Sequence, residues 1–172
     1  MTTTRIVPHD RLPDAAFDVM QAGFPHETHA ILRAFWNEHP NSIHALVYDA
    51  ETLVAHAGRI VRTFYIAETP VEVAYVEYVC AEPRRRGYGT EVVRAINAEI
   101  ERAGFTLAAL ATGSPEFYER LGWRVWRGPT AYRKDGVTVP APDEIVMVLD
   151  LGAGVDLDAP IACDWRPVGD IW

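Results

Sequence analysis

The stretch Val76-Glu-Tyr-Val-Cys-Ala-Glu-Pro-Arg-Arg-Arg-Gly-Tyr-Gly-Thr90 lies near the middle of the 172-residue chain. An apolar strand is interrupted by a proline, and a glycine-rich turn then leads directly into a segment with apolar residues at helical spacing. Glycines let a backbone approach a bulky anion, while helix-start N–H groups and nearby arginines attract its charge. The predicted phosphate-binding residues are Arg84, Arg85, Arg86, Gly87, Tyr88, Gly89 and Thr90.

Other classes of loop explain this stretch less well. A Walker loop is excluded because no Gly-Lys-Ser/Thr sequence follows, and a Rossmann dinucleotide site lacks its third glycine at the required spacing. A tight turn with solvated arginines remains the structural alternative.

The segments on either side of the loop predict one mixed α/β (α+β) domain over residues 1–172. Antiparallel strands come first and a strand–helix–strand–helix–strand run follows, which favours a central mixed sheet with helices on both faces. About seven strands are expected, at 4–7, 43–48, 53–66, 71–80, 105–110, 123–126 and 145–149. The expected helices are 13–21, 27–37, 87–102 and 115–121. Turns are expected at 128–130 and 134–136, and an irregular tail after residue 149.

The composition excludes several protein classes. Hydrophobic residues make up 49% and charged residues 23%, as in a globular domain that buries a core. The net charge of −8 argues against a nucleic-acid partner. No apolar run approaches the roughly 20 residues of a membrane span, and no signal segment opens the chain, so a cytoplasmic location is expected.

Charge is unevenly distributed along the chain. Residues 84–134 carry a net charge of +5, whereas residues 135–172 carry −7. Solvated surface charge is one explanation. The other is an anion site in the basic middle and a cation site built partly by the acidic end.

Two motifs together resemble the GNAT acetyltransferase superfamily. Arg84-Arg-Arg-Gly-Tyr-Gly89 is similar to its acyl-CoA pyrophosphate loop, and Phe117-Tyr-Glu-Arg-Leu-Gly-Trp123 to the short helix and glycine turn that follow. The resemblance implies a GNAT-like fold in which two central strands splay apart to form an acyl-CoA cleft. It also implies that the pantetheine of acetyl-CoA lies along Tyr78, Val79 and Cys80.

Acetyl transfer to an amine needs a base for the acceptor and a proton for the departing thiolate. Glu77, on the strand before the loop, is the candidate base, and Tyr118, on the short helix, is the candidate acid. Each has an alternative: a solvent-facing or paired carboxylate for Glu77, and an aromatic ring packed on the sheet for Tyr118. Cys80 would need a basic partner to act as a nucleophile, so a packed thiol is favoured.

The histidines give no reason to expect a metal. His26 and His29 have a helical offset, but no cysteine or carboxylate set completes a site around them.

The chain ends in Trp172, although chain ends are usually small, polar and frayed. Trp165 and Trp172 suggest that the tail docks onto the domain. A docked tail would bring Asp170 and the terminal carboxylate into place as acceptors for a cation. A tail held to the surface only by its tryptophans is the alternative.

Residues 42–172 are similar to the aminoglycoside 2′-N-acetyltransferases. The similarity rests on Gly128-Pro-Thr130, Pro140-Ala-Pro-Asp-Glu144 and the Cys163-Asp-Trp-Arg…Gly-Asp-Ile-Trp172 ending. It implies an acetyl-CoA-dependent enzyme, commonly a homodimer, in which Glu77 acts as base through water and Tyr118 as acid. It also implies that the amines of a polycationic antibiotic are held by Glu77, Asp143, Glu144, Asp170 and Trp172.

The sequence departs from that family at several points, including the segment around Trp36 and the tail Arg166-Pro-Val-Gly169, which is one residue longer than in the family. The early loop Gly23-Phe-Pro-His-Glu-Thr28 has one acid where the family places aspartates, and Tyr78 replaces a small residue beside the base. Another amine acceptor, such as a polyamine or a different amino sugar, is therefore the second hypothesis. An acyl-CoA-binding module without turnover is the third.

Overall fold

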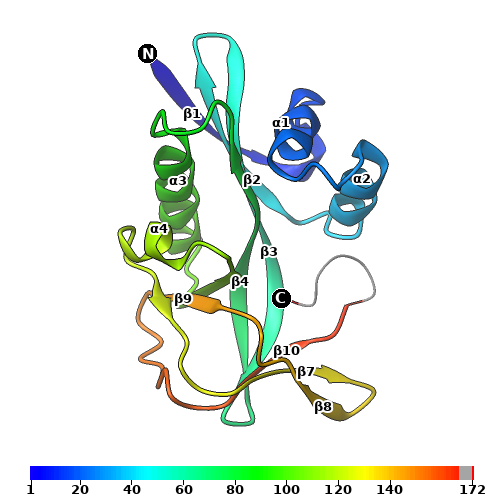
Figure 1. Ribbon diagram of the computed structural model, residues 1–172, viewed down its shortest axis with the longest axis vertical. Coiled ribbons are helices and arrows are strands. Elements are labelled where there is room, and N and C mark those ends of the chain that lie inside the picture. The colour runs from blue at the N-terminus through cyan, green and yellow to red at the C-terminus, as the bar shows by residue number, and fades with distance from the viewer. Residues whose placement is uncertain (167–171) are drawn as a thin grey trace. The chain divides into compact units, whose positions relative to one another are not determined.

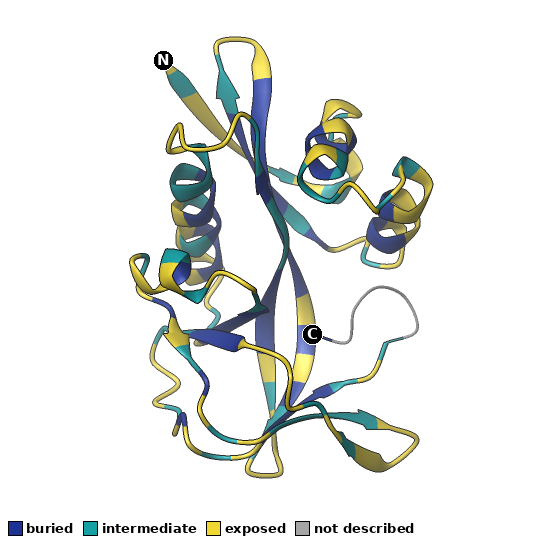
Figure 2. Cartoon of the chain, viewed as in Figure 1, coloured by how far each residue is buried: buried dark blue, intermediate teal, exposed yellow. Residues whose placement is uncertain are grey.

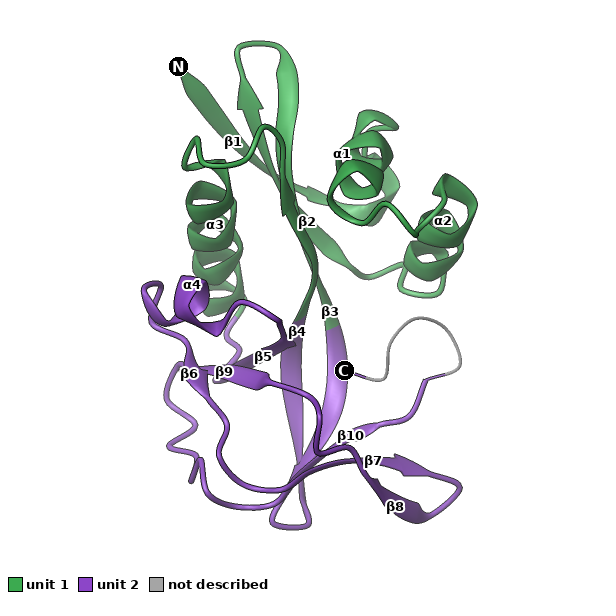
Figure 3. Cartoon of the chain, in the orientation of Figure 1, with its two compact units in different colours: residues 1–60, 76–103 green, residues 61–75, 104–172 purple. Residues whose placement is uncertain are grey.

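The computed structural model describes residues 1–166 and 172 (Figure 1). The chain forms two compact units, coloured separately in Figure 3. Unit 1 consists of Met1–Ile60 and Val76–Ala103, and unit 2 of Val61–Tyr75 and Gly104–Trp172. The two longest strands, β3 (Thr52–Ile66) and β4 (Thr69–Ala81), each run through both units.

Unit 1 is built on antiparallel strands with helices on both sides. Strand β1 pairs with β2, β2 pairs with β3, and β3 neighbours β4. The register of β2 and β3 places Ala45 opposite Ala57. Besides its parts of β3 and β4, the unit contains β1 (Thr2–Pro8), the 3-10 turn η1 (His9–Arg11), α1 (Ala15–Gly23), α2 (His29–Asn37), β2 (Ile43–Asp49) and α3 (Tyr88–Arg102).

Alternating residues of β3 face different helices. An added Cβ at Gly58 would lie 2.2 Å from Cη2 of Trp36, so α2 packs on that face of the strand. The next residue, Arg59, donates two hydrogen bonds of 3.0 Å to Glu99 of α3. Because side chains alternate along a strand, α2 and α3 cover opposite faces of the unit 1 sheet. Figure 2 shows how thoroughly this part of β3 is buried.

Gly58→Ala is expected to destabilise the protein by about 1–3 kcal/mol, because its methyl group would overlap the fully buried Trp36 ring. Urea unfolding followed by tryptophan fluorescence measures the change. Gly113→Ala is the matched control, since an added Cβ there has no atom within 4 Å. Equal stability of both variants would show that α2 shifts enough to make room for the added methyl group.

Unit 2 is a mixed sheet in the order β6-β9-β5-β4-β3-β10-β7-β8. Strand β10 pairs in antiparallel fashion with β3 and in parallel with β7. The parallel ladder of β4 and β5 is short, joining Ala74 and Tyr75 to Ala108 and Ala109. The unit's other elements are β5 (Leu107–Ala111), α4 (Pro115–Glu119), β6 (Arg124–Val125), β7 (Thr130–Lys134), β8 (Val137–Pro140), β9 (Val146–Asp150) and β10 (Ile161–Asp164).

The predicted α/β class is confirmed, with more strands than expected. Ten strands occur in the described residues, against the predicted seven, because β7, β8 and β10 were not anticipated. The turn at 134–136 is present, with positive φ at Asp135 and Gly136, but the short, partly exposed strands flanking it lack a clear alternating pattern. The expected final strand is β9, and β10 follows it where an irregular tail was predicted.

Candidate active site

The predicted phosphate loop joins β4 to α3 in unit 1. Gly87 occupies the helix N-cap with φ of +84°, a left-handed conformation that favours glycine, and α3 begins at Tyr88. Arg84, Arg85 and Arg86 are exposed. A hollow of about 420 Å³ opens at this point, lined by Arg86, Gly87, Thr90, Glu91 and Arg94.

The chemistry of this hollow fits a diphosphate. The first N–H groups of a helix have no acceptor within the helix and carry the positive end of its dipole. Arg86 and Arg94 add two cationic side chains to the lining, against one carboxylate, Glu91. An added Cβ at Gly87 would meet no atom within 4 Å, so the approach to the backbone there is open. The loop therefore has the donors and the space that the pyrophosphate of coenzyme A requires.

Tyr88 contributes to the loop through its backbone. Its hydroxyl donates a 2.6 Å hydrogen bond to Oδ2 of Asp49 on β2. This bond lowers the pKa of Asp49 and raises the pKa of Tyr88. With the ring held by Asp49, the group that Tyr88 can offer an anion is its N–H at the start of α3.

Arg86→Ala is expected to raise the Kd for coenzyme A about tenfold, because it removes a charge from the hollow, and tenfold corresponds to about 1.4 kcal/mol. Isothermal titration calorimetry at two salt concentrations measures this loss, which high salt should reduce. Arg11→Ala, at an exposed arginine of η1, is the control. An unchanged Kd for Arg86→Ala would remove Arg86 from the phosphate site.

The predicted base and pantetheine-binding residues lie together on the last part of β4. Glu77, Tyr78 and Val79 are half-buried, and Cys80 is buried. Burial raises the pKa of the Cys80 thiol to about 12. An added Cβ at Gly23, the last residue of α1, would lie 2.4 Å from Cβ of Cys80. Cys80 is therefore a protonated thiol packed under α1, as the non-catalytic interpretation expects.

The predicted acid, Tyr118, is buried on α4 in unit 2. Its ring is 4.9 Å from that of Phe117 and 6.1 Å from that of Trp123 in edge-on contacts. Pro115 is the first residue of the helix, and Gly122 follows the end of the helix with φ of +90°. Glu77 belongs to unit 1 and Tyr118 to unit 2, so their action as a pair stays a prediction.

The tail prediction is confirmed at one of its two tryptophans. Trp172 is buried, and its ring meets Phe64 of β3 edge-on at 5.4 Å. Trp165 stays exposed, with the Lys134 ammonium 4.1 Å from its ring centroid. Asp170 lies outside the described residues. Asp143 and Glu144 are exposed, in the turn that leads into β9.

Arginines near this tail were not anticipated. The Arg62 side chain is buried in unit 2. It donates hydrogen bonds to Oδ1 of Asp164 at 3.0 Å and to the backbone carbonyl oxygen of Asp164 at 2.6 Å. The Arg62 guanidinium also lies over the ring of Tyr75. Arg166 also lies over Tyr75, 5.7 Å from the ring centroid. The only sequence signal for the buried Arg62 is that a charged residue interrupts the apolar residues of β3. Asp164 is thus engaged by an arginine through Oδ1 and through its backbone carbonyl.

Two further acids of the C-terminal region have structural roles. Asp158 forms a two-point pair with Arg127, at 2.7 and 2.6 Å. Asp150 accepts backbone hydrogen bonds from Gly152, Gly154 and Val155. Some acids of the C-terminal region that was predicted to form a cation site therefore bind groups of the protein itself.

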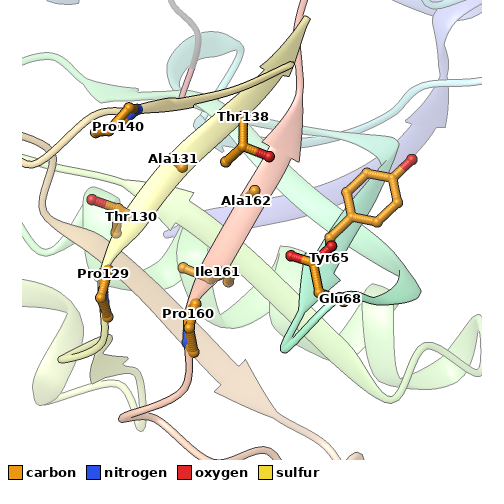
Figure 4. Close-up of a pocket in the computed structure, with 10 residues that line it drawn as sticks. All are labelled: Tyr65, Glu68, Pro129, Thr130, Ala131, Thr138, Pro140, Pro160, Ile161 and Ala162. Atoms are coloured by element: carbon orange, nitrogen blue, oxygen red, sulfur yellow. The ribbon is translucent and has the colours of Figure 1, made fainter. Parts of the chain in front are cut away.

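A second hollow, of about 210 Å³, lies in unit 2 between β7, β10 and the β3–β4 turn (Figure 4). Its lining is mainly apolar and includes Ile161 and Ala162, with Tyr65 and Glu68 at one side. The lining includes none of the residues predicted to bind acetyl-CoA or an acceptor.

Comparison with known proteins identifies the family. Residues 9–126 match the model of the acetyltransferase (GNAT) domain. The chain belongs to the GNAT acetyltransferase family. It is also 36% identical over 149 residues to the aminoglycoside 2′-N-acetyltransferase of Mycolicibacterium fortuitum, a match that covers 81% of this chain and 75% of the relative. The predicted resemblance is confirmed, and the chain is an acyltransferase.

Solved GNAT structures share the fold. An aminoglycoside 6′-acetyltransferase type Ii has a TM-score of 0.63 at 21% identity, covering 87% of this chain and 97% of its own. A Bacillus subtilis acetyltransferase solved with CoA has a TM-score of 0.61 at 13% identity, with coverage of 87% and 99%. A GCN5-related N-acetyltransferase from Kribbella flavida gives 0.62 at 20% identity and 74% coverage of this chain, which spans only 34% of that protein.

GNAT enzymes use acetyl-CoA, and the unit 1 loop suits it. The arginines, the open backbone at Gly87 and the start of α3 are the groups that would hold its diphosphate. In the part of the chain that the structure describes, no helix has the length and apolar character needed to cross a membrane.

Proposed function

We propose that this GNAT enzyme transfers an acetyl group from acetyl-CoA to the 2′-amine of an aminoglycoside. The observation that carries the proposal is the 36% identity, over most of the chain, to a 2′-N-acetyltransferase. We further propose that residues 1–172 act as one catalytic domain.

Bound acetyl-CoA would supply the acetyl group as a reactive thioester. Glu77 accepts the proton of the acceptor amine, directly or through a water molecule, so that the nitrogen lone pair becomes available. The N–H of Val79 donates to the carbonyl oxygen on which negative charge develops. Tyr118 supplies the proton that the departing thiolate takes up. Tyr78, Val79 and Cys80 line the backbone along which the pantetheine runs.

The acceptor is a polycation and needs oxygen ligands. We assign these to Glu77, Asp143, Glu144, Asp170 and the carboxylate of Trp172. Asp143 and Glu144 are both exposed, in the turn that leads into β9. The burial of the Trp172 ring against Phe64 supports a fixed position for that residue.

A smaller amine is the second candidate acceptor. The Tyr78 ring, beside Glu77, contacts Phe24 at 5.2 Å and Phe35 at 5.1 Å, which forms an aromatic cluster next to the proposed base. Bulky rings at this point favour a slim acceptor, such as a polyamine, over a branched sugar.

Thiol release from acetyl-CoA distinguishes these functions. The acceptor panel contains aminoglycosides with a 2′-amine, matched aminoglycosides with a 2′-hydroxyl, and spermidine. Turnover restricted to the 2′-amines is expected, and mass spectrometry of the product locates the acetyl group. Turnover only with spermidine would favour the second candidate. Binding of acetyl-CoA without turnover on any amine would indicate a non-catalytic module.

We also propose that the protein is a homodimer, that it is located in the cytoplasm and that it acts in antibiotic resistance. Light scattering during size-exclusion chromatography tests the first. Expression in a susceptible host, with the minimum inhibitory concentration measured against wild type and Glu77→Gln, tests the last.

A further inference from the structure

A chain of hydrogen bonds crosses the core of unit 1 and ends on β4. Ser42 Oγ lies 3.0 Å from Nε2 of His44, and Nδ1 of His44 lies 2.9 Å from Nε2 of His56. Nδ1 of His56 lies 2.9 Å from the carbonyl oxygen of Tyr78. All three side chains before Tyr78 are buried, with both histidines at 0% exposure. A polar chain this deep must be fully satisfied to be tolerated.

The direction of every bond in the chain follows from its last member. A carbonyl oxygen only accepts, so Nδ1 of His56 carries the proton. Burial lowers the pKa of His56 to about 4 and that of His44 to about 2, so each neutral ring holds one N–H. His56 Nε2 therefore accepts from Nδ1–H of His44, and His44 Nε2 accepts from the Ser42 hydroxyl.

The residue that receives this chain has unusual backbone geometry. Tyr78, within the last part of β4, has φ of +51°, a left-handed conformation that a residue with a Cβ rarely adopts. Such a conformation persists only where its surroundings hold it. Here the His56 bond holds the carbonyl, while Phe24, Phe35 and Trp36 surround the ring.

The Tyr78 carbonyl and the Val79 N–H belong to one planar trans peptide and point in opposite directions. A donor that fixes the carbonyl toward the core therefore turns the N–H away from it. The same bond polarises the peptide, which makes its N–H a stronger donor. The residue on the other side of Tyr78 is Glu77.

We propose that His56, supported by His44 and Ser42, is a positioning residue that orients the Tyr78–Val79 peptide and the adjacent Glu77 for acetyl transfer. This role rests on the proposed function, in which the Val79 N–H and Glu77 take part in the reaction. It explains why His44 and His56 each lie between two apolar residues of their strands, β2 and β3.

The first test does not depend on activity. Long-range ¹H–¹⁵N correlation spectra of the wild-type protein should show His44 and His56 as neutral Nδ1–H tautomers. Neither ring should titrate near its ordinary pKa of about 6.5. An Nε2–H tautomer at either ring would overturn the proposed chain.

The second test compares variants of His56. His56→Leu removes the donor at similar volume, whereas the side-chain N–H of His56→Asn can still reach the carbonyl. We expect His56→Leu to shift the Val79 amide resonance and to lower kcat about tenfold or more, with little change in the Kd for coenzyme A. His56→Asn should restore both readouts in part, and Glu51→Gln, at an exposed residue of the turn between β2 and β3, is the control.

The outcomes separate the two proposals. If wild type acetylates no amine, the proposed function fails, while the Val79 resonance still reports on the peptide. If wild type turns over and His56→Leu has the same kcat, the positioning role is wrong. Should His56→Leu not fold, Ser42→Ala removes only the first donor, and kcat per folded molecule is compared in the same way. An unchanged kcat together with a His56 ring that has switched to its Nε2–H tautomer would overturn the role, whereas an unchanged kcat with both tautomers retained would remove Ser42 from the supporting chain.

Discussion

Glu77→Gln is expected to lower kcat for acetyl transfer about a hundredfold while leaving the Kd for acetyl-CoA nearly unchanged, because an amide cannot accept the amine's proton. The replacement keeps the size and shape of a half-buried side chain on β4, so folding should not be affected. Thiol release measures kcat, and calorimetry with coenzyme A measures Kd.

Glu72→Gln is the matched control, since Glu72 is an exposed glutamate of the same strand. Raising the pH should increase the residual rate of Glu77→Gln when the acceptor amine loses its proton in solution. A parallel loss of rate and of coenzyme A affinity would instead indicate that Glu77 supports the loop, and would refute its role as base.

Arg59→Ala is expected to destabilise the protein by about 3 kcal/mol, because it leaves the Glu99 carboxylate charged and buried. The pair is two-point, at 3.0 Å for both bonds, and the two side chains are 10% and 3% exposed. Arg102 lies 3.9 Å from Glu99 and offsets part of the loss. Urea unfolding measures the change.

Replacing both Arg59 and Glu99 shows how much of the loss of stability comes from leaving one buried charge unpaired. Arg59→Met with Glu99→Leu should recover most of the lost stability, because apolar side chains of similar volume remove the unpaired charge. Arg127→Ala, which breaks an exposed pair with Asp158, should change the melting temperature little. If Arg59→Ala behaves like Arg127→Ala, water reaches Glu99 and the pair is not truly buried.

The elements with strong periodicity could be predicted from the sequence. The stripe Val92, Val93, Ile96 and Ile100 indicates α3, and all four side chains are buried. The loop after β4 was predicted because a proline, two glycines and arginines occur in one short run, a pattern governed by local chemistry. Strands β7, β8 and β10 could not be predicted, because four or five residues carry too little pattern and the pairing partners are distant in sequence.

The site was predicted only in its local parts. Glu77 and Tyr118 were assigned from their positions on β4 and α4, and their roles stay predictions. Nothing in the sequence reveals that His44 and His56, on neighbouring strands, lie within hydrogen-bond distance of each other. The same holds for Arg62 and Asp164, which are 102 residues apart. Such pairs depend on strand register, and a single sequence does not specify register between distant segments.

The strand order of unit 2 has a consequence for biosynthesis. Strand β10 lies between β3 and β7, yet it is the last of the described strands to leave the ribosome. Until then the nascent polypeptide exposes two unpaired edges, a state that invites aggregation or chaperone capture. Translation that stops before Ile161 therefore leaves β3 and β7 without the strand that joins them.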